Sequence, residues 1–187
     1  MRVFKILAVC LTGLMLWGAA PSPDPYLKVE TKEQLNEVFL QVKTIAESLG
    51  LSLKFPIEAV LVSEQKLDEL YKGPYRGMEV GLHTMKNGNH SIMIMQGEDR
   101  DMTGGILAHE YGHAWEMENC SPAMNQVFRE GFAEWLKYKY YDQVGAYRLM
   151  EEMREVQDPV YGEGFKRVLE WEDKYGVEGV LNRIKKQ

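Results

Sequence analysis

The five residues His109-Glu110-Tyr111-Gly112-His113 constrain the fold of this chain more than any other stretch, because they lie inside a segment with helical spacing. Four residues of α-helix advance about 6 Å and turn about 400°, so the two imidazoles share one face of the helix, one turn apart. The opposite face carries apolar side chains, namely Leu107, Tyr111 and Ala114. The fold must therefore cover the back of this helix and leave its histidine face open.

Two imidazoles in this arrangement can bind one metal ion, and the pattern predicts Zn2+. Zinc at about 2.0 to 2.1 Å from each ring still needs a third protein ligand and leaves its fourth position to water. That ligand must be a carboxylate, because His83 and His90 lie upstream and no HExxHxxGxxH pattern is present. Glu116 and Glu118 share the helix of the motif and lie too far along its axis to complete a tetrahedron.

The next predicted helix, over residues 122–141, supplies two better candidates. Ser121-Pro122 are typical of an N-cap followed by the first helical residue. Glu130 and Glu134 lie one turn apart on this helix and face away from its apolar side. We assign Glu130 as the third metal ligand and Glu134 as the acceptor for a histidine N–H, which would set the tautomer of that ring. The alternative for Glu134 is a solvated helix carboxylate.

The other side chains that could take part in chemistry are predicted to have structural roles. We expect His83 and His90 to be surface or hairpin residues rather than ligands. Cys120 is expected to be an unreactive thiol at a helix end. Met93 and Met95 are expected to fill the core and a strand face.

The rest of the chain predicts a small sheet followed by a helical half. An amphipathic helix starts at a capping box of Thr31 and Gln34 and ends before Gly50. Three strands are predicted, of which the last two form a hairpin around residues 86–89; they cover 56–63, 76–84 and 90–96. Helices then follow over 102–118, 122–141, 144–156, 163–174 and 177–186. The predicted fold class is therefore α/β of the α+β kind, with a mixed sheet of about three strands.

Length and charge narrow the class of protein further. The chain has 187 residues, 45% hydrophobic and 27% charged, which predicts one globular domain able to build a core without disulfides or a structural metal. A metal site is therefore expected to serve chemistry. The net charge of −6 argues against a nucleic-acid partner. No disulfide is expected, because one of the two cysteines, Cys10, lies in an apolar N-terminal run.

That run predicts export from the cytoplasm. Residues 1–20 place two basic residues before an apolar stretch and end in small residues, the pattern of a secretory signal peptide. Pro21 follows the best cleavage point and opposes cleavage, so an uncleaved N-terminal membrane anchor is the alternative. We expect residues 21–30 to be a proline-rich spacer and residues 31–187 to be a single domain.

Over roughly residues 56–186 the chain resembles a known family. The shared motifs are Arg76-Gly77, Ile92–Met95 with Gly97, Leu107–Glu110 with His113–Trp115, Glu130-Gly131, Tyr161–Phe165 and Lys174–Gly176. These resemble the gluzincin-type zinc peptidases, specifically the peptidase domain of the plant DA-one proteins, which are ubiquitin-activated LIM-domain peptidases, and their small bacterial relatives. The resemblance implies a zincin-like fold with His109, His113 and Glu130 as zinc ligands and Glu110 as the catalytic residue.

The chain also departs from the plant proteins. It has no paired CxxC motifs and hence no LIM modules, and we find no ubiquitin-interacting helix in its sequence. Arg129 stands where the plant proteins resemble one another in having a second glutamate. Ubiquitin activation and the plant substrates are therefore not carried over.

The expected activity is zinc-dependent hydrolysis of a protein or peptide substrate by a monomer. Glu110 would act as the general base toward zinc-bound water. A downstream tyrosine would stabilise the oxyanion, and we choose Tyr161 for this role. The rival candidates Tyr140 and Tyr141 are expected to be aromatic core residues. We also expect an extended substrate to pair with the strand over 90–96. The alternatives are a non-catalytic, zinc-stabilised interaction module of the cell envelope and an amidase acting on peptidoglycan.

Overall fold

The computed structural model describes residues 24–71 and 80–187. The predicted leader over 1–20 and the first residues of the strand predicted over 76–84 lie outside these residues. Within the described part, no helix has both the length and the apolar character needed to cross a membrane.

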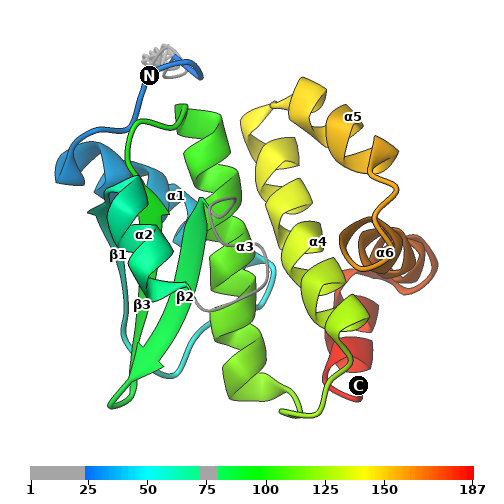
Figure 1. Ribbon diagram of the computed structural model, residues 1–187. Helices are drawn as coiled ribbons and strands as arrows, with labels where there is room; N and C mark the ends of the chain where they lie inside the picture. Colours follow the sequence, from blue (N-terminus) through cyan, green and yellow to red (C-terminus); the bar gives the residue numbers. More distant parts are fainter. Residues whose placement is uncertain (1–23, 72–79) are drawn as a thin grey trace, which may run out of the picture.

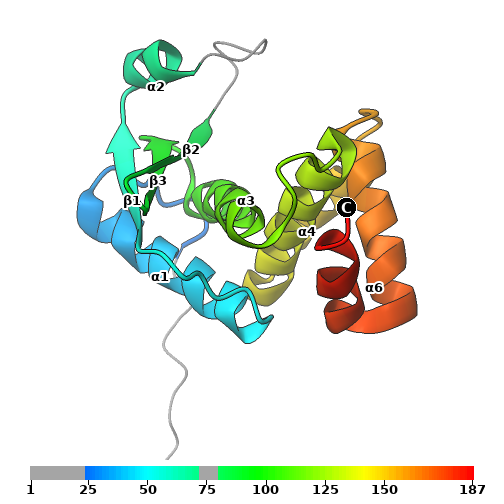
Figure 2. The ribbon, with the colours of Figure 1, turned by 90° about the horizontal axis from the view of Figure 1, so that it is seen from below.

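The described residues form a mixed α/β fold with a three-stranded sheet and six helices, which confirms the predicted fold class (Figure 1). In chain order the elements are α1 (Lys32–Ser48), β1 (Ile57–Val62), α2 (Glu64–Leu70), β2 (Gly81–Lys86), β3 (Asn89–Met95), α3 (Arg100–Asn119), α4 (Gln126–Val144), α5 (Tyr147–Glu155) and α6 (Tyr161–Ile184). Figure 2 shows α3 between the sheet with α1 on one side and α4 with α6 on the other.

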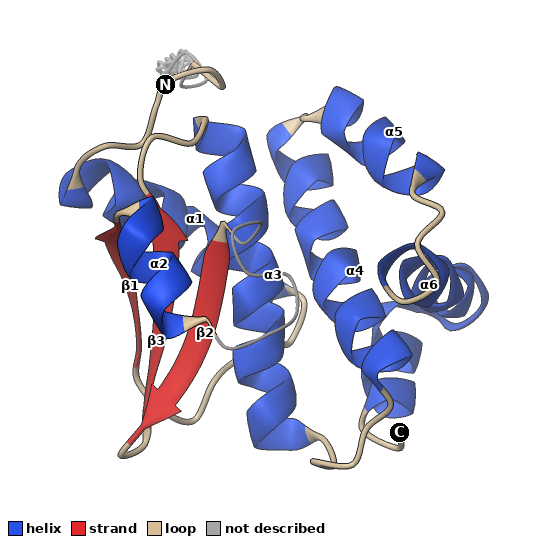
Figure 3. Ribbon diagram, in the orientation of Figure 1, coloured by secondary structure: helices blue, strands red, loops and turns tan. Residues whose placement is uncertain are grey.

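The sheet has the strand order β1-β3-β2 (Figure 3). β1 pairs with β3 in parallel, and β2 pairs with β3 antiparallel, so the predicted hairpin is confirmed. Its turn places Asn87 at φ 53° and Gly88 at φ 77°, the left-handed conformations that a two-residue hairpin turn requires. Because β3 has a neighbour on both sides, the prediction that a substrate pairs along residues 90–96 is wrong. Alternating side chains indicate a strand but do not reveal its neighbours.

One face of the sheet is buried under α1 and α3. His90, Ile92 and Ile94 of β3 project from this face and are at most 1% exposed. The amphipathic pattern of α1 matches this burial, and the helix begins with the predicted capping box, in which the Thr31 hydroxyl accepts from the backbone N–H of Gln34. The sheet and α1 thus cover the apolar back of α3, as the helical wheel requires.

The start of one helix and the presence of another differ from the prediction. Helix α4 begins at Gln126, so the prediction that Ser121-Pro122 cap it is wrong. Asn125 is the N-cap, and its side chain accepts from the N–H of Val127. The backbone carbonyl of Ser121 accepts from the N–H of Met124 in the turn before the helix. Ser and Asn are both good N-cap residues, so the sequence alone does not decide between them. The turn that joins α3 to α4 takes up residues 120–125 and moves the cap to Asn125. The short helix α2 was not predicted.

The break predicted between residues 174 and 177 is confirmed. Gly176 adopts φ 67° and ψ −179° and interrupts the helical conformation of α6. The chain before α1 also joins the fold: Val29 is 2% exposed, its N–H donates to the Glu98 carbonyl, and its own carbonyl accepts from Gly97. The residues 27–29 of the predicted spacer therefore pack beside the start of α3.

Candidate metal centre

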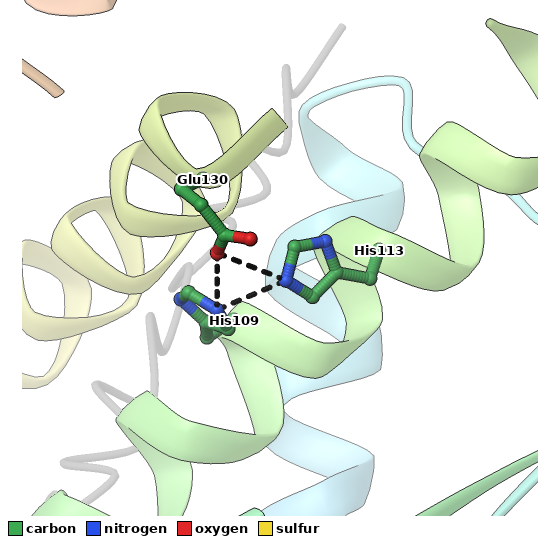
Figure 4. Close-up of side chains that lie close together, drawn as sticks. All are labelled: His109, His113 and Glu130. Carbon is green, nitrogen blue, oxygen red and sulfur yellow. Dashed lines mark hydrogen bonds and ion pairs between the residues drawn. The ribbon is translucent and has the colours of Figure 1, made fainter. Parts of the chain in front are cut away.

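The structure brings His109 and His113 of α3 together with Glu130 of α4 (Figure 4). The two Nε2 atoms lie 3.0 Å apart, and each lies 3.4 Å from Oε2 of Glu130. All three side chains are largely buried, with 12% to 19% of each exposed. Helices α3 and α4 run antiparallel, so the face carrying the histidines meets the face carrying the carboxylate.

These distances fit a zinc ion. Ligands at about 2.0 to 2.1 Å in a tetrahedron are separated by about 3.3 Å, close to the three measured edges. A point about 2.0 Å from all three atoms therefore exists just outside their plane. Two imidazoles and one carboxylate are also a donor set that catalytic zinc sites use. The geometry of the described side chains thus agrees with the predicted ligand set.

His109 is oriented by Glu134. Nδ1 of His109 lies 2.8 Å from Oε1 of Glu134, so this nitrogen donates its proton and the unprotonated Nε2 faces His113 and Glu130. Burial disfavours a charge on Glu134, but Lys137 at 3.3 Å and the bond from His109 outweigh it and lower the pKa of Glu134 to about 2. The geometry therefore suits the role assigned to Glu134 better than that of a solvated carboxylate.

His113 has a partner that the sequence reasoning missed. Its Nδ1 lies 3.5 Å from Oε2 of Glu116, whose other oxygen accepts a 2.9 Å bond from Nε of Arg129. The spacing of three residues between His113 and Glu116 on one helix was the available signal. Arg129 thus holds the carboxylate that faces His113.

Glu110 lies on the same face of α3, against the edge strand β2. A Cβ placed on Gly81 would lie 2.4 Å from Cγ2 of Ile106 and 3.4 Å from Oε1 of Glu110, so glycine at this position leaves room for Ile106 and lets β2 lie in contact range of Glu110. Within the described part of the chain, Glu110 makes no hydrogen bond or ion pair through its side chain. Its carboxylate is therefore available to a water or a substrate.

A cavity of about 920 Å³ opens over this cluster. Its walls come from β2, α3, α4 and the start of α6, and they include Tyr161. The ring of Tyr161 stacks on that of His109 with centroids 6.4 Å apart, and Asp158 positions it by accepting from the Tyr161 N–H. Tyr140 and Tyr141 are 1% exposed and pack against glycines of α3, so they belong to the core.

The two remaining histidines form a buried chain with Glu118. Nε2 of His83 lies 2.8 Å from Nδ1 of His90, and Nε2 of His90 lies 3.0 Å from Oε1 of Glu118. Both histidines lie in the hairpin, as predicted, but His90 is 1% exposed and is not a surface residue. Burial, followed by the nearby His90 and His113, lowers the pKa of His83 to about 4. Strand register brings these residues together, which local spacing cannot reveal.

Comparisons of the chain with protein-family models, curated proteins and solved structures give no match.

Proposed function

We propose that this protein is a zinc-dependent metallopeptidase. The observation that carries the proposal is the triangle of His109, His113 and Glu130 atoms, with edges of 3.0, 3.4 and 3.4 Å. Beside it in an open cavity lies the carboxylate of Glu110, which has no partner among the described residues. A structural zinc site normally closes its fourth position with a protein ligand and has no use for Glu110. The resemblance to the DA-one peptidase domain supports the same activity, and the predicted leader supports action outside the cytoplasm.

Glu110, Tyr161 and Glu134 would act in the reaction beside the three zinc ligands. Zinc bound to the triangle supplies a Lewis acid and lowers the pKa of a bound water toward 7. Glu110 accepts a proton at its carboxylate and returns it to the leaving amine. Tyr161 donates its O–H to the carbonyl oxygen of the scissile peptide as negative charge develops there. Glu134 keeps His109 in the tautomer that presents Nε2 to the ion.

The edge strand β2 offers a binding surface for an extended peptide. β2 pairs only with β3 among the described strands, and Val80, Gly81 and Leu82 line the cavity. A peptide added along this edge would form main-chain hydrogen bonds with β2 and pass over Glu110. This proposal replaces the pairing with residues 90–96, which the sheet order excludes.

The test compares the full chain with Glu110→Gln. Both proteins should bind one zinc per chain by metal analysis, because residue 110 is not a ligand. Cleavage of an unbiased peptide library, measured by mass spectrometry, should fall by about 10² to 10⁴ in the variant, the usual contribution of a general acid and base. Glu151→Gln, an exposed carboxylate on α5, is the matched control and should cleave like the wild type.

Unchanged turnover in Glu110→Gln would refute the mechanism. Zinc bound by a wild-type protein that cleaves no peptide would support the non-catalytic, zinc-stabilised module instead.

A further inference from the structure

The buried chain of Glu118, His90 and His83 ends at the cavity of the metal centre. His90 is 1% exposed, and so is the side chain of Glu118. His83 lies on the edge strand β2, two residues after Gly81, and lines the cavity. A polar chain that is fully buried at one end and stops at a substrate cavity at the other can determine which groups of a ligand are bound there.

The direction of each hydrogen bond in this chain follows from Glu118, the residue at its buried end. The carboxylate of Glu118 accepts the backbone N–H of Lys54 at 2.7 Å and that of Phe55 at 3.1 Å, and these bonds favour its ionised form. An ionised carboxylate only accepts, so His90 donates to it through Nε2, and the neutral tautomer of His90 that does so has an unprotonated Nδ1, which accepts. His83 must therefore donate through Nε2.

A neutral imidazole carries one ring proton, so Nδ1 of His83 has none. His83 is neutral near pH 7, since burial holds its pKa far below that value. No described residue forms a hydrogen bond to Nδ1 of His83. Among the described residues, the one side-chain nitrogen or oxygen that is both fully buried and without a partner is Oγ1 of Thr103, so Nδ1 of His83 is not fully buried. Nδ1 is consequently accessible, with its lone pair free to accept a bond.

We propose that His83 is a specificity-determining residue: its Nδ1 is a fixed hydrogen-bond acceptor that selects peptides with an O–H or N–H donor in the side chain lying beside β2. This inference rests on the proposed peptidase function. It also separates His83 from Tyr161, because an unprotonated nitrogen cannot donate to an oxyanion. A purely structural role would need only Nε2, the nitrogen bonded to His90.

The test uses two variants that each keep one end of the ring. In His83→Gln the amide reaches the position of Nε2 and keeps the link to His90. In His83→Asn the shorter amide lies at the position of Nδ1 and keeps an acceptor toward the cavity. The substrates are peptides taken from the cleaved library and made in pairs that differ by Thr or Val, which have similar shape but differ in the O–H donor.

Wild type should prefer Thr over Val about three- to tenfold in kcat/KM at one position near the scissile bond, as expected for one neutral hydrogen bond. His83→Asn should keep this preference despite a lower Tm. His83→Gln should lose it, with a ratio near one, while its Tm stays near that of wild type. A structural role predicts the opposite, with changes in activity that follow Tm.

Two outcomes would overturn the inference while leaving the peptidase in place: no Thr preference at any position, or a preference that His83→Gln retains. Nitrogen NMR of the imidazoles is independent of turnover, and a proton on Nδ1 of His83 at pH 7 would also overturn it. A wild-type protein that cleaves no peptide, with Nδ1 unprotonated, would instead refute the proposed function together with this use of His83.

Discussion

Replacing Glu134 with leucine tests whether metal binding at the proposed site depends on the carboxylate that is bonded to His109. The variant removes the acceptor that lies 2.8 Å from Nδ1 of His109. Both side chains are 14% exposed, so solvent can replace the lost partner only in part. Without an acceptor, the imidazole loses the bond that presents Nε2 to the ion.

The size of the effect follows from this contact. A hydrogen bond to a charged group contributes about 1.5 to 3 kcal/mol, which corresponds to about 10- to 150-fold in a dissociation constant. We therefore expect Glu134→Leu to raise the Kd for zinc by about 10- to 100-fold. Glu134→Gln keeps an acceptor oxygen and should raise the Kd less. Competition with a chelator of known affinity at pH 7.5 measures both values.

Two controls isolate the contact. Lys137 lies 3.3 Å from the same oxygen of Glu134, so Glu134→Leu also leaves an ammonium group without its partner. Lys137→Met alone should leave the zinc Kd within about twofold of wild type. Asp142→Asn removes an exposed carboxylate from the same helix and should change nothing. A Glu134→Leu protein that binds zinc as tightly as wild type would refute the assigned role.

Three further results are expected. Removing zinc with a chelator should lower Tm by about 5 to 10 °C if zinc was present at about 100 times its Kd, as differential scanning calorimetry would show. Gly131→Ala should lower the free energy of unfolding by about 1 to 2 kcal/mol in urea titrations. The added Cβ would lie 2.3 Å from the carbonyl carbon of Gly164, and the gain in helix propensity offsets only part of that clash. A variant as stable as wild type would contradict this packing. Cys120, whose pKa burial and Glu116 raise to about 11, should react slowly with iodoacetamide at pH 8 and faster as the pH rises toward 11, whereas the urea-unfolded chain should already react quickly at pH 8.

The parts of the site that follow from spacing along one helix could be predicted. His109 and His113 share a face because they are four residues apart, and the same spacing relates Glu130 to Glu134. The apolar backs of the two helices then leave few ways to pack them, and those ways bring the polar faces together. The predicted cluster therefore needed no knowledge of the sheet.

The parts that depend on pairing between distant segments could not be predicted. The central place of β3 depends on its parallel pairing with β1, and the meeting of His83 with His90 depends on hairpin register. The contact of Glu118 with the N–H groups of Lys54 and Phe55 joins residues more than sixty positions apart. Helical or strand periodicity carries no information on such contacts.

The antiparallel arrangement of α3 and α4 has a topological consequence. A metal ion held by His113 and Glu130 closes the intervening chain, with its turn at residues 120–125, into a covalent and coordinate ring. Such a ring restricts the chain as a disulfide does, by removing conformations from the unfolded state. Unlike a disulfide, it opens when a chelator takes the ion, without any change in redox state. The same atoms proposed for hydrolysis would therefore also act as a reversible cross-link between the sheet half of the molecule and its helical half.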